Sequence, residues 1–245
     1  MHPTKRLILH IKNNRAGEEA FRFTADRIGA ALERHAEIAN RIDIRVDWDL
    51  DSFEKSMRDA DALVTWDLPT AGLAEKAPHL RWIHIIGAGV EHLQPLDWLP
   101  PQTGLTNNRG IHAGKTAESA AMAVLMLHNR IPAYVTDQRA ARWNPVFVPL
   151  IAGKTVAVIG VGEMGGAAAR AFKALGLTVL GIRRGGGAHP HVDEMHGPEN
   201  MRDVLGRADF VHITLPQTPE TTGLIDRRAI RAMKPGAGLV NFGRA

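Results

Sequence analysis

Short apolar runs alternate with longer amphipathic stretches along the whole chain. In the first hundred residues, four such runs predict strands near 6–11, 43–46, 62–65 and 82–86. The stretch 18–39 has apolar residues at helical spacing and predicts a helix between the first two strands, and a short helix is expected after Ser52. Alternating strands and helices are typical of parallel α/β architecture, so this half of the chain is expected to form a small doubly wound unit.

The segment from Leu99 to Gly104 is rich in Pro and Gly and predicts a domain boundary. We therefore expect a substrate-side domain over residues 1–104 and a second domain over 105–245. A long helix is predicted over 115–138, and Pro132 should kink it or end its regular part. Its apolar stripe is expected to serve the core or a subunit interface and consists of Ala117, Ala120, Ala121, Val124 and Leu127.

Alternation resumes in the remainder of the chain. Strands are predicted at 155–160, 178–182, 210–215 and 238–242, with helices at 165–175, 200–207 and 227–233 and a loop rich in Gly and His after residue 182. The expected fold class is α/β with two doubly wound parallel-sheet domains, a flavodoxin-like one followed by a Rossmann-type one.

The strongest local motif is a Gly-x-Gly-x-x-Gly sequence directly after the apolar run 156–159. Gly160 permits the tight turn, Gly162 lets a pyrophosphate approach the backbone, and Gly165 permits close packing of helix on strand. The helix that opens directly after the motif offers N–H groups and a positive dipole end to phosphates, and Glu163 and Met164, inside the motif, are expected to contact the cofactor together with the three glycines. The motif, with a strand on either side, predicts a dinucleotide site.

The end of the second strand of this unit indicates which dinucleotide binds. A site for NAD usually carries Asp or Glu there, but this chain has Arg183 and Arg184 followed by glycines. Guanidinium groups suit a 2′-phosphate, so NADP(H) is the preferred cofactor and NAD(H) the alternative. The opposing interpretation is a pair of solvated loop arginines.

Composition and charge exclude several classes of protein. The chain has 245 residues, 44% of them hydrophobic, and no cysteine, so disulfides and zinc–thiolate sites are absent and a cytoplasmic location is expected. No apolar run reaches the roughly 20 residues of a membrane span. The net charge of +4 and pI of about 9.7 come from dispersed Lys and Arg, which argues against nucleic acid as a partner.

Four further segments, in order, resemble the D-2-hydroxyacid dehydrogenases, most closely the glyoxylate/hydroxypyruvate reductase branch. They are Ile85–Leu93 with its Gly-Ala-Gly-Val sequence, 107–118, 215–225 and 233–245. The resemblance implies that Gly87, Ala88, Gly89 and Val90 present backbone N–H groups to the substrate carboxylate, as a turn of this kind can do. It also implies reduction of a small 2-oxo acid in the cleft between two domains, and a homodimer.

The same resemblance assigns the remaining site residues. Arg244 is the catalytic arginine, whose fixed fork would hold the substrate and stabilise charge on its carbonyl oxygen. Trp66 and Arg109 lie in segments that border the expected pocket, although Trp66 also suits a core aromatic at a strand end. No metal site is expected. The loop and last strand beside the nicotinamide contribute further cofactor contacts from Leu215, Pro216, Thr222, Phe242 and Gly243.

The family places its acid/base histidine and a partner carboxylate after this arginine, where the sequence has only Ala245. His84 and His112 lie near expected site segments, and a core or surface role is expected for each. The cluster in the Gly- and His-rich loop, His189, His191 and His196, is expected to be solvated, with adventitious metal binding or a place near the 2′-phosphate as the alternative. A chain lacking its C-terminal part is therefore expected, with the strand at 238–242 open on one side or covered by a partner. The alternatives are a catalytically silent dinucleotide-binding or scaffolding protein, like the corepressor relatives, or a relative of the formate or phosphoglycerate dehydrogenases.

Overall fold

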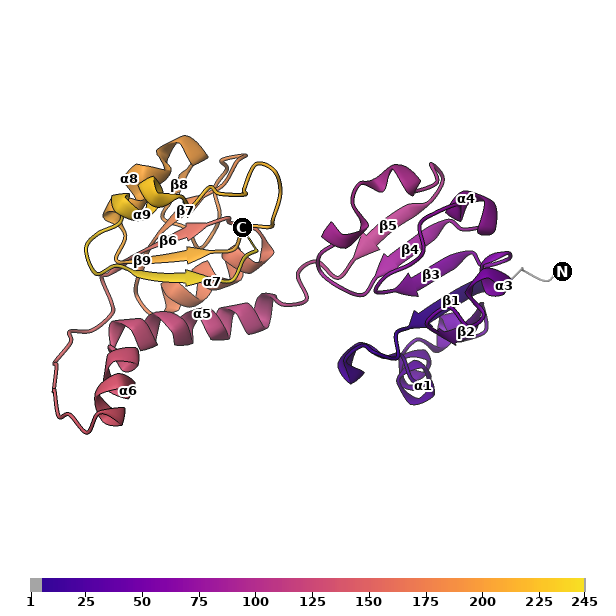
Figure 1. Ribbon diagram of the computed structural model, residues 1–245, viewed down its shortest axis with the longest axis horizontal. Coiled ribbons are helices and arrows are strands. Elements are labelled where there is room, and N and C mark those ends of the chain that lie inside the picture. The colour runs from indigo at the N-terminus through magenta and orange to yellow at the C-terminus, as the bar shows by residue number, and fades with distance from the viewer. Residues whose placement is uncertain (1–5, 245) are drawn as a thin grey trace. The chain divides into compact units, whose positions relative to one another are not determined.

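The computed structural model describes residues 6–244, and the chain divides into two compact units (Figure 1). The first unit ends at Arg109 and the second begins at Gly110. The division lies five residues beyond the predicted boundary, because Gly104–Asn107 is a strand, β5, that pairs with β4 (Trp82–Ile85) of the first unit. Among the described residues, no helix is long and apolar enough to cross a membrane.

The first unit is a five-stranded parallel sheet in the order β2-β1-β3-β4-β5, the flavodoxin-like arrangement. All four predicted strands are confirmed close to their expected bounds, as β1 (Leu7–Asn13), β2 (Ile42–Trp48), β3 (Ala62–Thr65) and β4. The short edge strand β5 was not predicted. Its sequence, Gly-Leu-Thr-Asn, has no apolar run, and its conformation depends on pairing with β4.

The helix predicted over 18–39 is divided in the structure. It consists of a 3-10 turn, η1 (Glu19–Phe21), and the helices α1 (Ala25–Arg34) and α2 (Ala36–Ala39). The side chain of Thr24 accepts a hydrogen bond from the backbone of Arg27 at 3.4 Å and so caps the start of α1. The helix expected after Ser52 is α3 (Phe53–Met57), and the remaining helices are α4 (Leu73–Lys76), η2 (Glu91–Leu93) and η3 (Leu96–Trp98).

The second unit is a parallel sheet in the order β10-β9-β6-β7-β8. Numbered from its own first strand, this is 5-4-1-2-3, the Rossmann arrangement read from its far edge. The predicted strands are confirmed as β6 (Thr155–Ile159), β7 (Thr178–Ile182), β9 (Phe210–Ile213) and β10 (Gly238–Asn241), with β10 at one edge. An unpredicted strand, β8 (Glu194–His196), forms the other edge within the loop rich in Gly and His. The helices are α7 (Glu163–Ala174), η4 (Pro198–Asn200), α8 (Met201–Arg207) and α9 (Arg227–Ala232).

The long helix predicted over 115–138 is two helices, α5 (Ala113–His128) and α6 (Ile131–Arg139). The break lies at Asn129 and Arg130, and Arg130 adopts a left-handed conformation with φ of +55°. Pro132 falls in the first turn of α6, where its missing N–H has no acceptor within the helix. The expected interruption near Pro132 is therefore confirmed, and the break itself precedes the proline.

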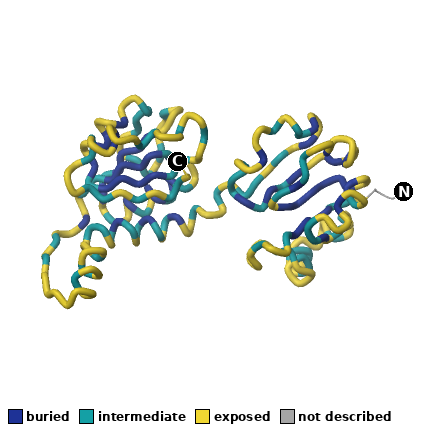
Figure 2. The backbone as a smooth tube through the Cα atoms, viewed as in Figure 1, coloured by how far each residue is buried: buried dark blue, intermediate teal, exposed yellow. Residues whose placement is uncertain are grey.

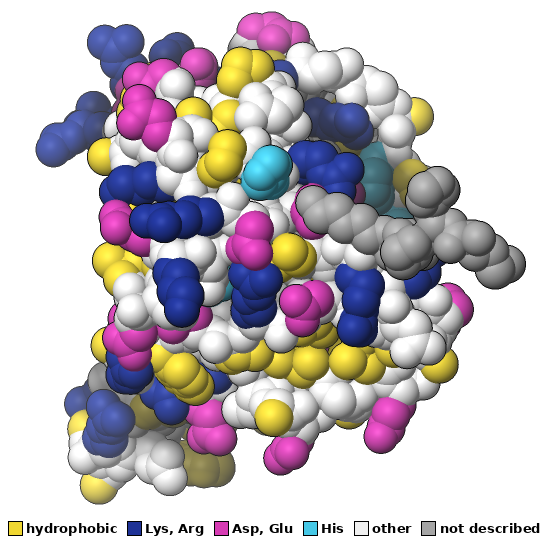
Figure 3. All heavy atoms as spheres, turned by 90° about the vertical axis from the view of Figure 1, so that its right-hand side faces the viewer, with side chains coloured by type: hydrophobic (Ala, Val, Ile, Leu, Met, Phe, Trp, Pro, Cys, Tyr) yellow, Lys and Arg dark blue, Asp and Glu magenta, His cyan; other side chains and the backbone are white. Residues whose placement is uncertain are grey.

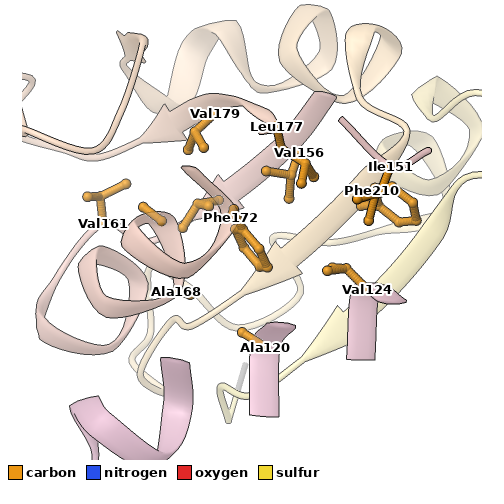
Figure 4. Close-up of a cluster of buried hydrophobic side chains, with 12 residues drawn as sticks. Ala120, Val124, Ile151, Val156, Val161, Ala168, Phe172, Leu177, Val179 and Phe210 are labelled. Atoms are coloured by element: carbon orange, nitrogen blue, oxygen red, sulfur yellow. The ribbon is translucent and has the colours of Figure 1, made fainter. Parts of the chain in front are cut away.

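Buried residues concentrate on the strands of both sheets (Figure 2). In the second unit, Ala120 and Val124 of α5 join Phe172 of α7 and Phe210 of β9 in one cluster (Figure 4). The expected stripe of α5 is thus part of the core at these two positions. Met122 and Met126, on the same helix, are exposed. This packing fixes α7 on the sheet, and the first turn of α7 forms part of the candidate site.

Candidate functional site

The glycine motif occupies the point in the second sheet where the strand order reverses. β6 is flanked by β7 on one side and by β9 on the other, so a crevice is expected beyond the carboxyl ends of β6 and β9. Gly160 has φ of +99°, a conformation that favours glycine. A Cβ on Gly165 would collide with the Gly160 carbonyl oxygen and lie 2.8 Å from Oγ1 of Thr214. The close packing expected at Gly165 is therefore present.

The turn between β6 and α7 fits a diphosphate. Nothing lies within 4 Å of the position that a Cβ on Gly162 would take, so its backbone faces open space. The helix α7 begins at Glu163, and the N–H groups of a first helical turn have no acceptor inside the helix. Thr214 donates a hydrogen bond from Oγ1 to the Gly160 carbonyl at 2.6 Å and so fixes the turn. The sequence motif did not reveal this threonine, which lies 54 residues away.

Arg183 and Arg184 directly follow β7 and are both exposed. The backbone N–H of Arg183 donates to the His196 carbonyl of β8 at 3.0 Å, which leaves its side chain at the carboxyl edge of the sheet. A hydrogen bond from Thr218 chiefly lowers the pKa of Glu220, and the charge of Arg184 lowers it further, so this carboxylate lies within electrostatic range of Arg184. Burial, together with the nearby His191 and Arg183, lowers the pKa of His189.

The loop after β9 and the residues after β10 are joined by backbone hydrogen bonds. Phe242 donates from its N–H to the Ile213 carbonyl at 2.8 Å, and Arg244 donates to the Leu215 carbonyl at 3.0 Å. In the loop itself, Thr221 donates to the Pro216 carbonyl at 2.6 Å. Other hydrogen bonds anchor Thr222 on the Thr218 carbonyl and Gly243 on the side chain of Asn241. The predicted residues Leu215, Pro216, Phe242, Gly243 and Arg244 are thus brought together at one edge of the second sheet, and Ala245 lies outside the described residues.

In the first unit, the predicted anion-binding turn at Gly87–Val90 follows β4. The carbonyl oxygens of Ile86 and Gly87 are occupied: Asn108 donates from Nδ2 to Ile86 at 2.8 Å and from its backbone N–H to Gly87 at 3.0 Å. Asn107 donates from Nδ2 to the Ala88 carbonyl at 2.9 Å. In a trans peptide the C=O and the next N–H point in opposite directions. The N–H groups of Ala88 and Gly89 are therefore directed away from β5, as an anion-binding turn requires.

His84 holds the amide of Asn108 in this orientation. Because Nδ2 of Asn108 donates to Ile86, its Oδ1 faces Nε2 of His84 at 3.0 Å, and Nδ1 of His84 lies 2.9 Å from Oγ1 of Thr106. A neutral ring with its proton on Nε2 satisfies both contacts. Both ring nitrogens of His84 thus contact side chains of its own unit. One negative charge faces the turn, because a Cβ on Gly89 would lie 2.9 Å from the carboxyl carbon of Glu91.

The strand order of the first sheet reverses between β1 and β3, and a cavity of about 400 Å³ lies at their carboxyl ends. Trp66 lines this cavity, is 41% exposed, and stacks on His92 with ring centroids 5.2 Å apart. The Trp66 ring also lies against Gly87, where two of its atoms are 3.1 Å from the position of a Cβ. Trp66 therefore forms part of a cavity wall rather than the core, whereas Arg109 is exposed at the end of the unit.

The floor of the same cavity contains an ion pair that sequence reasoning missed. Nζ of Lys12 lies 2.6 Å from Oδ1 of Asp67, and the Lys12 side chain is only 5% exposed. Partial burial opposes ionisation of Asp67, but hydrogen bonds from Lys12 and Asn14 outweigh it and lower the pKa of the carboxyl group. A lysine at the end of an apolar strand was the one signal that could have drawn attention to this position.

The histidines of the loop after β7, and His112, show no metal-binding grouping in the described part of the chain. Within residues 6–244, no group of three or more His, Asp or Glu side chains is placed to hold a metal ion. The rings of His189 and His191 lie 5.8 Å apart, His196 contacts Glu194, and His112 is exposed at the start of α5. On the face drawn in Figure 3, basic and acidic side chains are interspersed, consistent with the dispersed charge of the sequence.

Comparison with known proteins identifies relatives that match most of this chain. A D-3-phosphoglycerate dehydrogenase of Mycobacterium bovis is 31% identical over 222 residues, 85% of this chain and 41% of that protein. A glyoxylate reductase of Thermococcus litoralis is 29% identical over 203 residues, 78% of this chain and 61% of that protein. The chain thus spans roughly two fifths to three fifths of the length of these relatives.

Solved structures show the same fold. An NADPH-dependent glyoxylate/hydroxypyruvate reductase of Sinorhizobium meliloti, in complex with NADP and sulfate, matches with a TM-score of 0.74 and 26% identity, over 97% of this chain and 73% of that one. A family protein from Aeromonas salmonicida matches with the same TM-score and identity over 98% of this chain. The sequence profile of the D-isomer specific 2-hydroxyacid dehydrogenase NAD-binding domain matches residues 121–245, just over half of the chain. The chain belongs to the D-isomer specific 2-hydroxyacid dehydrogenases, and its second unit is their NAD-binding domain.

Proposed function

We propose that this protein is part or all of an NADP(H)-dependent reductase of small 2-oxo acids of the glyoxylate/hydroxypyruvate type, which forms D-2-hydroxy acids. The observation that carries the proposal is the glycine turn at the reversal point of the second sheet, followed at the end of β7 by Arg183 and Arg184 in place of a carboxylate. The Sinorhizobium meliloti relative is NADPH-dependent and was solved with NADP, which supports the same preference here. NAD(H) is the alternative cofactor.

In this proposal the bound nicotinamide supplies a hydride for C2 of the substrate. The α7 N-terminus and the turn at Gly160–Gly165 hold the diphosphate, and the two arginines hold the 2′-phosphate. The segments at Leu215, Pro216 and Thr222 and at Phe242 and Gly243 position the nicotinamide ribose.

The turn at Gly87–Val90 binds the substrate carboxylate through backbone N–H groups. Arg244 is the proposed catalytic arginine, because a permanently charged guanidinium stabilises negative charge that develops on the carbonyl oxygen. Its backbone is fixed on Leu215, beside the residues proposed to contact the nicotinamide.

Replacement of Arg183 and Arg184 by Ala tests the cofactor assignment. Each charge-assisted phosphate contact contributes about 1.5–3 kcal/mol, so loss of both should lower NADPH affinity by at least about a hundredfold while NADH affinity changes little. The control is Arg207→Ala, which removes an exposed arginine paired with Glu194 in the same unit. Fluorescence titration with both nucleotides measures the effect, and an equal loss for NADPH and NADH would contradict the 2′-phosphate assignment.

Turnover is tested separately, by a steady-state assay with NADPH and glyoxylate, hydroxypyruvate or phosphohydroxypyruvate. Reduction of glyoxylate or hydroxypyruvate supports the proposed reaction. Tight NADPH binding without reduction of any of these acids would instead indicate a dinucleotide-binding protein without catalysis. A cytoplasmic location stays a prediction from the cysteine-free sequence.

We also propose that the protein forms a homodimer through the segment after α6. This segment exposes Trp143 by 91%, Phe147 by 97% and Leu150 by 85%, far more apolar surface than an isolated chain normally shows to water. Met122 and Met126 of α5 add to the exposed apolar surface of the unit. Sedimentation velocity should show a dimer that Trp143→Ser and Phe147→Ser together convert to monomer, and a monomeric wild-type chain would contradict the proposal.

A further inference from the structure

The cavity of the first unit is built to receive a ligand. It lies beyond the carboxyl ends of β1 and β3, where the strand order reverses, and open α/β sheets bind their ligands at such points. Its volume is about 400 Å³. Phe21, Trp66 and Ile86 supply apolar wall, and the polar lining comprises Asn13, Asn14 and the charged residues Lys12, Glu18, Arg22 and Asp67. A cavity that combines apolar wall with placed polar groups is typical of a small-molecule site.

The ion pair in this cavity leaves one donor and one acceptor for a ligand. An ammonium group carries three N–H donors, and those of Lys12 reach Oδ1 of Asp67 at 2.6 Å and Oδ1 of Asn14 at 2.5 Å. Oδ1 of Asp67 also accepts from Nδ2 of Asn14 at 3.1 Å. Within residues 6–244, no further partner is found for the third N–H of Lys12 or for Oδ2 of Asp67.

The third N–H of Lys12 and Oδ2 of Asp67 together match the hydrogen-bonding groups of a hydroxyl. A hydroxyl oxygen accepts from an ammonium N–H, and its proton donates to a carboxylate oxygen. An anionic ligand group would satisfy Lys12 but face the carboxylate of Asp67, and a methyl group would satisfy neither. Because the Lys12 side chain is 95% buried by the protein, with 5% exposed, a ligand that leaves its third N–H without a partner carries a desolvation cost.

The cavity adjoins the proposed carboxylate site. Ile86, the residue directly before the turn at Gly87–Val90, lines the cavity, and Trp66, which also lines the cavity, lies against Gly87. The N–H groups of Ala88 and Gly89 point away from β5. In the strand order, β3 and the residue Trp66 that follows it lie on the side of β4 opposite to β5. A 2-oxo acid bound by its carboxylate at the turn thus has the cavity beside it.

We infer that this cavity is the subsite for the C3 substituent of the substrate, and that Lys12 and Asp67 select 2-oxo acids whose substituent carries an uncharged hydroxyl group. The inference rests on the proposed function and narrows its substrate class. Glyoxylate, which has no C3 substituent, leaves the cavity empty and the pair without a ligand partner. Hydroxypyruvate and longer hydroxylated 2-oxo acids fill it.

Two hydroxy acids that differ by a single oxygen test the selection. D-glycerate and D-lactate share the carboxylate and the C2 hydroxyl, but C3 carries a hydroxyl only in D-glycerate. With saturating NADPH no hydride transfer takes place, since both partners are already reduced. Isothermal titration calorimetry on the full chain should then show D-glycerate binding roughly tenfold tighter than D-lactate, the effect of a hydrogen bond to a buried charged group.

The variant Lys12→Met keeps the length of the side chain and removes its donors, and should reduce the ratio of the two affinities to about one. Lys12→Gln, which retains a polar contact to Asp67, is used if the methionine variant does not fold, and should reduce the ratio in the same direction. The control is Lys76→Met, which breaks an exposed pair with Glu54 at 2.9 Å in the same unit and should leave the ratio unchanged.

The possible outcomes separate the two proposals. A wild-type chain that binds both acids equally, or a ratio that Lys12→Met does not change, overturns the selection by Lys12 and Asp67 while the proposed function stands. A wild-type chain that binds NADPH but neither acid overturns the proposed substrate class and the inference together.

Discussion

From the buried His212 on β9 we predict how the free energy of unfolding of the second unit changes at acid pH. His212 is fully buried between the rings of Phe172 and Phe242, whose centroids lie 5.4 and 4.9 Å from its own. Neither ring nitrogen has a hydrogen-bond partner. Burial therefore lowers the pKa of His212 to about 4, from an ordinary value of 6.5.

The sign of the effect follows from the protons bound in each state. Between pH 6.5 and 4 the unfolded chain protonates this histidine and the folded chain does not, so the free energy of unfolding falls as the pH is lowered through that window. At pH 7.5 His212 costs almost nothing. At pH 5 the loss is about 2 kcal/mol, and it approaches roughly 3 kcal/mol below pH 4.

His212→Leu replaces the imidazole by an apolar group of similar size and removes the titration. The free energy of unfolding of this variant should exceed that of the wild-type protein by about 2 kcal/mol more at pH 5 than at pH 7.5. Urea unfolding followed by circular dichroism gives the total change. Hydrogen exchange of peptides from β6 and β9 assigns it to the second unit, because His10, also buried with a lowered pKa, titrates in the first.

The control is His79→Leu, since His79 is exposed and its side chain stays in water on folding. If His212→Leu and the wild-type protein lost stability in parallel between pH 7.5 and 5, the reasoning would be refuted. His79→Leu keeps His212 and should lose stability as the wild-type protein does; if it removed the loss as His212→Leu does, burial of His212 would not be the cause.

Three further substitutions examine the two candidate binding turns. Gly165→Ala places a Cβ against the Gly160 carbonyl and Thr214, so it should move α7 off the strand and weaken NADPH binding at least tenfold by fluorescence titration. Asn108→Ala frees the carbonyl of Ile86 and should weaken the binding of oxamate, an unreactive 2-oxo acid analogue, by roughly tenfold in calorimetry. The control Thr103→Val removes a similar hydrogen bond to the Leu80 carbonyl at the other end of β5 and should leave oxamate binding unchanged. Glu91→Gln removes the negative charge beside Gly89 and should tighten oxamate binding several-fold, and weaker binding would show that the carboxylate supports the turn.

The strands that sequence analysis located best are those that bury both faces. β3 and β7 have the predicted bounds, because a continuous apolar run marks a strand covered on both sides. The glycine motif was equally informative, since each glycine meets a local steric requirement of the turn that follows β6. Arg183 and Arg184 were recognised for a similar reason, because the end of β7 could be predicted from its own residues.

The tertiary structure decided the features that are formed by residues distant in the chain. The edge strands β5 and β8 lack an apolar run and depend on pairing with β4 and β7. Lys12 and Asp67 are 55 residues apart, and Thr214 and Gly160 are 54 apart. Periodicity reports which face of a local element is buried, but it carries no information about which distant strand ends beside it. The sequence by itself therefore determined the order of the main strands and helices and the glycine turn after β6, and only the fold brought together the ion pair, the cavity and the hydrogen bonds that orient the turn after β4.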